Sequence, residues 1–136
     1  MTQILNPPGW AKPRGYSNGT AARGAVVSIA GQVGWNAQAR FESDDFAEQA
    51  RLAIRNALAV LAEAGGRPEH VVRMTWYVTD KRAYLAAGKA LGAAYRELMR
   101  TAEGSVHYPA MTAVEVSALM EDRALVEIEV TAVVPD

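Results

Sequence analysis

Residues 45–66 carry the pattern that most constrains the fold, because they predict a long helix with a single apolar face. Asp45 is a typical N-cap residue, and Glu48 stands three positions later, where the partner of a capping box belongs. Gly65–Gly66 ends the segment, as glycine does just past a helix C-terminus. A helix of this kind must bury its apolar stripe on something flat, so we expect a sheet beneath it. The stripe recurs at three- and four-residue steps and comprises Phe46, Ala50, Ile54, Ala57, Leu58 and Leu61.

The other segments supply that sheet and a second helix. Residues 16–23 and 25–32 predict two strands joined at Gly24, and the alternating residues 71–79 predict a third, with Val72, Met74, Trp76 and Val78 on one face. A second helix should run from Asp80 to about Thr101. Residues 111–119 and 125–134 are the last two strands. Gly31 and Gly34, at the end of the second strand, indicate a bulge or a close backbone approach. The second helix should bury Tyr84, Leu91, Tyr95 and Leu98.

The resulting order, β-β-α-β-α-β-β, predicts one α+β domain over residues 1–136, with both helices on one face of the sheet. In the last strand, Val126, Ile128, Val130, Ala132 and Val134 share one face, whereas Glu127 and Glu129 lie on the other. The face with the two carboxylates is therefore in water, or it lines a pocket or a subunit junction.

Charge and composition limit the classes of function that this chain can have. The net charge is −1, so nothing draws the chain electrostatically to nucleic acid or to an anionic membrane. The sequence contains no cysteine, which excludes disulfides, thiolate nucleophiles and Cys-ligated metal sites. It has no apolar run of membrane-spanning length and no signal-peptide pattern at Met1–Trp10, so we expect a soluble cytoplasmic protein.

Four short motifs occur in the order known from one protein family. They are Gly15–Tyr16–Ser17, Ala30–Gly31–Gln32–Val33–Gly34, Tyr108–Pro109–Ala110–Met111–Thr112 and Val126–Glu127–Ile128–Glu129. Together they resemble the reactive-intermediate deaminase (RidA/YjgF) family over nearly the whole chain. The resemblance implies a homotrimer of chorismate-mutase-like fold, with ligand pockets between subunits. It also implies hydrolysis of reactive imines and enamines to ketoacids and ammonia without metal or cofactor.

The resemblance also implies which residues form the site. Tyr16, Gly31 and Glu127 match the family's tyrosine, glycine and glutamate, which suit the orientation of an imine nitrogen and the activation of one water. Met111 stands where the family has an arginine, whose fork would grip a substrate carboxylate at both oxygens. Two smaller residues, Ala30 and Ala113, replace a serine and a cysteine.

Several of these residues have alternative interpretations. Arg14, two positions before Tyr16, is a candidate replacement for the missing cation. Glu127 either activates water or is a solvated strand carboxylate, and Tyr16 either lines a pocket or covers the edge of the core. His107 is either an acid–base group near neutral pH or a polar loop residue. Trp35 walls a pocket or packs a subunit contact.

Two functions follow. The first is a trimeric, cofactor-free hydrolase of a small imine, enamine or related carbonyl compound, with altered activity because Met111 replaces arginine. The second is a binding module with the same pockets but without turnover, which senses a metabolite or partners another enzyme. A nucleolytic role, suggested for some relatives, is weak here because the chain has no basic patch.

Overall fold

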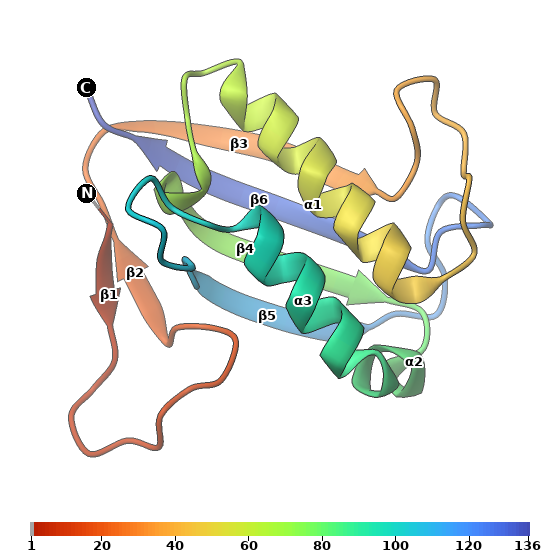
Figure 1. Ribbon diagram of the computed structural model, residues 1–136, viewed down its shortest axis with the longest axis horizontal. Coiled ribbons are helices and arrows are strands. Elements are labelled where there is room, and N and C mark those ends of the chain that lie inside the picture. Colours follow the sequence, from red (N-terminus) through yellow and green to blue (C-terminus); the bar gives the residue numbers. More distant parts are fainter. Residues whose placement is uncertain (1) are drawn as a thin grey trace.

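The computed structural model describes residues 2–136 and has two layers, a four-stranded sheet and helices that cover one of its faces (Figure 1). The strands of this sheet lie in the order β3-β6-β4-β5. A separate two-stranded ribbon, β1-β2, stands beside them. The predicted α+β class and the placement of both helical segments on one face are confirmed. The elements are β1 Gln3–Leu5, β2 Gly19–Ala21, β3 Ala25–Val33, α1 Phe46–Ala62, the 3-10 turn η1 Pro68–His70, β4 Val71–Val78, α2 Lys81–Ala86, α3 Gly88–Leu98, β5 Ala110–Glu115 and β6 Val126–Val134.

Helix α1 forms where the sequence predicts it. The Asp45 carboxylate accepts a hydrogen bond from the Glu48 amide at 3.0 Å, which caps the first turn. The capping box is only half formed, because the Glu48 carboxylate pairs with Arg51 instead of returning to the cap backbone. The hydrogen bond from Arg51 lowers the pKa of the Glu48 carboxyl.

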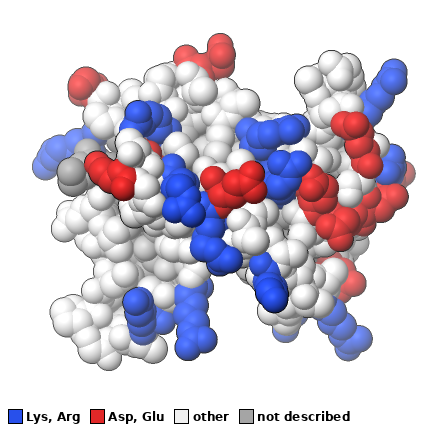
Figure 2. All heavy atoms as spheres, viewed as in Figure 1, with Lys and Arg blue, Asp and Glu red and all other residues white. Residues whose placement is uncertain are grey.

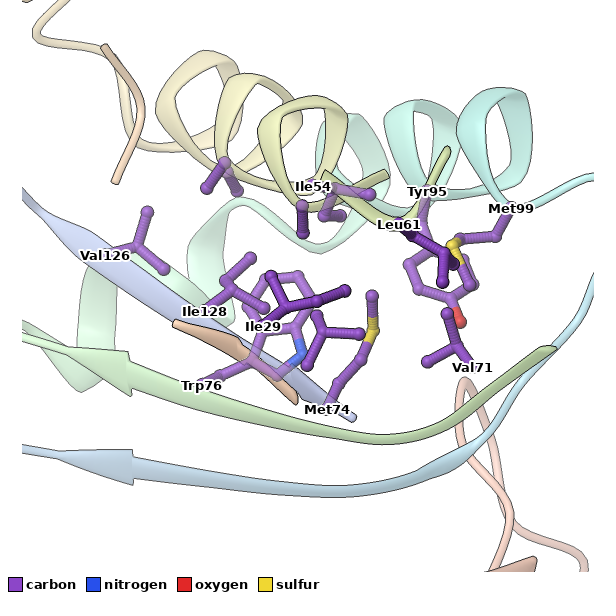
Figure 3. Packing of buried hydrophobic residues seen from close by; sticks show 14 of the residues in the cluster. Ile29, Ile54, Leu61, Val71, Met74, Trp76, Tyr95, Met99, Val126 and Ile128 are labelled. Carbon is purple, nitrogen blue, oxygen red and sulfur yellow. The ribbon is translucent and has the colours of Figure 1, made fainter. Parts of the chain in front are cut away.

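The core lies between α1, α3 and the helix-facing side of the sheet. Figure 3 shows Ile54 and Leu61 of α1 pointing toward Ile128 of β6 and Met74 of β4. The alternation predicted for the last strand is confirmed on β6. On β4 one residue differs from the prediction: Val71, not Val72, is fully buried, because the pairing with β6 shifts register between Val71 and Arg73.

Three element boundaries differ from the predictions. The second helix is two helices, α2 and α3, because the chain leaves the helical conformation at Ala87, just before Gly88. The strand expected over residues 16–23 is only Gly19–Ala21, and it pairs with the unpredicted β1 in the N-terminal segment. The strand expected to reach Leu119 ends at Glu115.

The sheet leaves one face and two edges without cover from the helices. Alternate residues of β4 and β6 face away from the helices, among them Tyr77, Glu127 and Glu129. β3 and β5 are the edge strands. Edge strands present unpaired backbone groups, so both edges are available for contacts beyond the sheet.

Candidate functional site

A pocket of about 360 Å³ lies where the N-terminal loop, the edge strand β5 and the pair α2–α3 meet. The loop contributes Arg14 and Tyr16, and β5 contributes Met111. The structure therefore brings these three sequence-predicted site residues together. Four aromatic side chains also line the pocket, namely Trp76, Tyr84, Tyr95 and Tyr108.

These aromatic walls are held by packing among themselves. The rings of Tyr95 and Tyr108 stack with centroids 5.2 Å apart and an angle of 9° between their planes. Tyr84 meets Trp76 edge-on at 6.1 Å. The Tyr95 hydroxyl donates to the His107 carbonyl at 2.7 Å, and burial raises the Tyr95 pKa, so this wall is neutral. The pocket is thus a pre-formed aromatic surface suited to a flat or apolar ligand.

The position of Tyr16 follows from its two neighbours in the chain. Gly15 has a φ of 77°, a left-handed conformation that favours glycine. The buried Ser17 donates its amide hydrogen to the Pro109 carbonyl at 3.0 Å, and its hydroxyl donates to the Tyr108 carbonyl. Ser17 also bridges Ala110 at the start of β5. Tyr16 is therefore fixed beside Tyr108, with 40% of its surface exposed.

Two arginines, Arg14 and Arg96, line the same pocket. Among residues 2–136, neither makes a hydrogen bond or an ion pair through its side chain. Arg96 extends over Gly92 one turn earlier on α3, because a Cβ atom at position 92 would lie 3.0 Å from Arg96 Nη1. The pocket therefore combines aromatic walls with two positive charges that have no protein counterion in the described chain.

A second group of predicted site residues, Ala30, Gly31 and Glu127, lies on β3 and β6. The absent side chain at Gly31 makes room for the carboxylate: a Cβ there would lie 2.0 Å from Glu127 Oε2. The β3-β6 pairing also shifts register between Ile29 and Gln32, which removes Ala30 and Gly31 from the regular ladder. The close approach and the bulge expected at Gly31 are both present.

The first group lies at the β5 edge of the sheet, whereas the second lies at the other end, on the edge strand β3 and its neighbour β6. Met111 is on β5 and Gly31 is on β3, and two strands separate them. Three inter-strand spacings of about 4.8 Å put the two edges roughly 14 Å apart. Their faces differ too: Met111 is in register with the buried Met74, whereas Glu127 is in register with Tyr77 on the uncovered face. One chain by itself therefore does not unite Tyr16 and Met111 with Gly31 and Glu127.

The other candidates lie apart from both groups. Trp35 packs on Phe41 with ring centroids 5.7 Å apart and lines a separate hollow with Gln32 and Asn56. Ala113 is exposed on β5, outside the aromatic pocket. Of the two interpretations of His107, the polar surface residue was wrong, and the acid–base role stays a prediction. His107 is buried, and its Nε2 donates to the Val71 carbonyl at 2.7 Å.

The described residues show neither a metal centre nor a membrane span. No group of three or more His, Asp or Glu side chains in residues 2–136 is placed to hold a metal ion. In the same range, no helix has both the length and the apolar character needed to cross a bilayer. On the face seen in Figure 2, basic and acidic side chains are interspersed and form no continuous basic stripe.

Sequence reasoning missed several residues of the aromatic pocket. Tyr84 and Tyr95 were assigned to the buried stripe of a helix, and Arg96 was not considered. One signal was present: Gly88, Gly92 and Arg96 recur at four-residue steps and therefore share one helix face. Two glycines on one exposed helix face indicate a surface kept free of side chains, which is unusual for a face that only contacts water.

Known proteins are similar to this chain in both sequence and architecture. The family model described as endoribonuclease L-PSP matches residues 10–134. A RutC family protein from Aquifex aeolicus is 32% identical over 133 residues, which are 98% of this chain and 99% of that protein. The chain belongs to the Rid (YjgF) family.

Solved structures of Rid proteins agree with this assignment. YyfB from Yersinia pestis, a conserved Rid family protein, has 30% sequence identity and a TM-score of 0.80, with 98% of each chain covered. E. coli TdcF, solved with bound serine, has 28% identity and a TM-score of 0.67 over 96% of this chain and 98% of its own. The resemblance read from the four motifs is confirmed. Membership of the Rid family supports a small-molecule-processing protein.

Proposed function

We propose that this Rid protein is a cofactor-free hydrolase of imines or enamines that works as a homotrimer, with its active sites between subunits. The observation that carries the proposal is the division of the site residues between two separate parts of one sheet. Tyr16 and Met111 lie at the β5 edge, whereas Gly31 lies on the edge strand β3 with Glu127 beside it on β6.

A closed ring of subunits would unite these two half-sites. In a head-to-tail ring, one edge of each subunit meets the opposite edge of the next, so every junction contains one copy of both halves. The uncovered sheet face carries the exposed apolar side chains Val26 and Val114, which favours its burial in an assembly. A trimer makes three complete sites from three incomplete chains.

The chemistry proposed for such a site is addition of water to a C=N bond. Glu127 accepts a proton from the attacking water, whose oxygen bonds to the imine carbon, and the nitrogen gains a proton. The tetrahedral carbinolamine then loses ammonia as the C–N bond breaks and the carbonyl forms. The overall reaction is imine plus water to ketone plus ammonia, so it needs no oxidant or reductant. Tyr16 and the backbone around Gly31 are suited to orient the nitrogen.

A second candidate function is ligand binding without turnover. Met111 favours it, because a thioether offers no charge to a carboxylate where the family resemblance places an arginine. TdcF, the E. coli relative, was solved with serine bound, which shows that a Rid protein holds a small amino acid. A binding module of this kind would keep the aromatic pocket but would not depend on Glu127 for its effect.

The test is ammonia release from imines generated in situ by an amino-acid oxidase. We expect acceleration over the uncatalysed rate, lost in Glu127→Gln because an amide does not accept a proton from water. Glu129→Gln is the matched control, since Glu129 lies two residues away on the same face of β6. Ligand binding that persists in Glu127→Gln, with no acceleration by the unaltered protein, would favour the binding module.

A further inference from the structure

We infer that Arg96 of α3 is the carboxylate anchor of the aromatic pocket, and that the ligand class is carboxylates with an aromatic or long apolar side chain. This inference rests on the proposed function, because it names the substrate class for the same site. Arg14 supplies a second positive charge to the same pocket.

The surroundings of Arg96 leave its charge available to a ligand. On a helix, a side chain pairs with residues three or four positions away, and those positions hold Gly92, Ala93, Met99 and Arg100. None of these is acidic, so α3 provides no partner for Arg96. No ion pair among residues 2–136 involves it. A more ordinary role is a favourable charge in the last turn of α3, close to the negative end of the helix dipole.

Gly92 favours the ligand role over the dipole role. Glycine in a helix interior costs about 1 kcal/mol relative to alanine, and a dipole interaction does not require it. Its absent side chain leaves the space into which Arg96 Nη1 extends, at 3.0 Å from where a Cβ would be. Gly88, one turn earlier, lines the same pocket. The face of α3 that borders the pocket thus has no side chains at Gly88 and Gly92, so the Arg96 guanidinium can lie along it.

The walls of the pocket determine which group the ligand carries next to its carboxylate. Tyr95 and Tyr108 present stacked rings. Trp76 also lines the pocket, but its indole nitrogen is inaccessible and offers no polar group. A pocket of about 360 Å³ with such walls exceeds the needs of a three-carbon imino acid and lies within the range of about 300–1,000 Å³ typical of ligand sites. An aromatic 2-imino or 2-oxo acid fits both features: its carboxylate pairs with the arginine and its ring packs on the aromatic walls.

The experiment measures binding of three stable probes to the full chain by calorimetry: phenylpyruvate, pyruvate, and phenylacetone, which lacks the carboxylate. We expect phenylpyruvate to bind most tightly, with affinity falling as salt is raised. Arg96→Gln should weaken phenylpyruvate binding at least about tenfold, the loss expected for one charge-assisted hydrogen bond, and should leave phenylacetone unchanged. Arg14→Gln should give a smaller loss.

Two further variants separate an anchor from a structural residue. Arg55→Gln removes an exposed arginine of α1 outside the pocket, so it matches the charge change and should not alter binding. Gly92→Ala should preserve or raise stability, because alanine favours helix, yet weaken phenylpyruvate binding by displacing Arg96. Equal affinity of Arg96→Gln and Arg55→Gln for phenylpyruvate would overturn the inference, as would equal binding of phenylpyruvate and phenylacetone by the unaltered protein.

The same variants, assayed for ammonia release, distinguish failure of the anchor from failure of the proposed function. Arg96-dependent binding without imine hydrolysis supports the anchor and refutes the hydrolase. Hydrolysis of the phenylalanine-derived imine at equal rates by the unaltered protein and Arg96→Gln supports the hydrolase and refutes the anchor.

Discussion

Met111 is the single residue at which the proposed ligand preference of the pocket can be tested most directly. It lies on β5 within the aromatic hollow, and its thioether adds apolar surface where an arginine would add a charge. Arg14 and Arg96 already bring two positive charges to this hollow. An added guanidinium therefore gains a carboxylate contact and also incurs repulsion from its neighbours.

Met111→Arg should raise hydrolysis of short imino acids such as 2-aminoacrylate by about tenfold or more, because a bidentate grip is restored close to β5. The same substitution should lower the stability of the ligand-free protein through like-charge repulsion, and Arg96→Gln should relieve that loss. Ammonia release and thermal unfolding measure the two effects. Adding Glu127→Gln should abolish the gain. A folded Met111→Arg protein without any gain would indicate that the pocket has diverged beyond its anchor.

His107 is a buried titratable residue whose ionisation couples to the stability of the fold. Burial lowers its pKa, outweighing the hydrogen bond from Nε2 to the Val71 carbonyl. The unfolded chain thus takes up a proton at His107 more readily than the folded chain does. Its contribution to stability is fully present above the unfolded pKa of about 6.5 and is lost as pH falls toward the folded value.

We expect the urea midpoint of the unaltered protein to fall between pH 7.5 and pH 5.5, and the fall to be smaller in His107→Gln. His70→Gln is the comparison: burial is the main cause of the lowered His107 pKa and the charge of His70 only a minor one, so this variant should keep most of the fall. The measurement is equilibrium unfolding at a fixed protein concentration. Parallel pH dependence in the unaltered protein and His107→Gln would contradict this account.

Among the elements, β3 and the residue just after it each make a close approach that depends on glycine, at Gly31 and Gly34, and the two differ in what an added side chain would contact. A Cβ at Gly34 would lie 2.4 Å from the Gln49 carbonyl oxygen in the backbone of α1. At Gly31 the obstacle is the tip of the Glu127 side chain, which can rotate away. Gln49 is itself buried. Its side-chain amide donates to the carbonyls of Ser43 and Arg123 and accepts from the backbone N–H of Leu125, so this end of α1 has little freedom to move.

Gly34→Ala should therefore destabilise the fold by about 1–3 kcal/mol, the usual cost of overpacking. Gly31→Ala should change stability by less than about 1 kcal/mol but lower imine hydrolysis, since it displaces the proposed base. Denaturant unfolding and ammonia release on both variants test the contrast. If Gly31→Ala proved as destabilising as Gly34→Ala, the carboxylate would be a fixed structural group.

The elements also differ in how far sequence predicts them. Helix α1 and strand β6 were predictable because cap, stripe and alternation are local patterns that agree with their burial. The interruption at Ala87 was not, since alanine is the best helix former and the apolar spacing continues through it. Strand β1 carries no burial pattern at all, because its three residues are exposed and only pairing with β2 defines it.

The same limit applies to the site. Motifs indicated Tyr16, Gly31, Met111 and Glu127, but not the separation of Tyr16 and Met111 from the other two across the sheet. That separation arises because β6, the last strand in the chain, inserts between β3 and β4. Strand order is a long-range property, which no single segment encodes. Arg96 lies outside all four motifs, and it becomes a candidate binding residue only because it lines the pocket.

At the scale of the whole molecule, the proposed function makes assembly the condition for activity, because the two half-sites are separate in one chain. Val26 is 69% exposed and Val114 is 41% exposed, both on the uncovered face, so water meets apolar surface on the edge strands β3 and β5. Covering that surface stabilises an assembly, and a closed head-to-tail ring covers it without leaving a free edge. We therefore expect a trimer in solution at micromolar concentration.

Lysine at Val26 or Val114 should place a charge in the buried junction and shift the protein toward monomers, while the secondary structure seen by circular dichroism is retained. Hydrolysis should fall together with the trimer fraction, because Tyr16 and Glu127 would no longer meet across a junction. Val60→Lys is the matched control, since Val60 is 43% exposed but lies on α1, in the layer that covers the other face. Sedimentation velocity measures the trimer fraction, and ammonia release on the same samples measures hydrolysis. A stable, active monomer of the unaltered protein would contradict this account, because both halves of the site would then have to act within one chain.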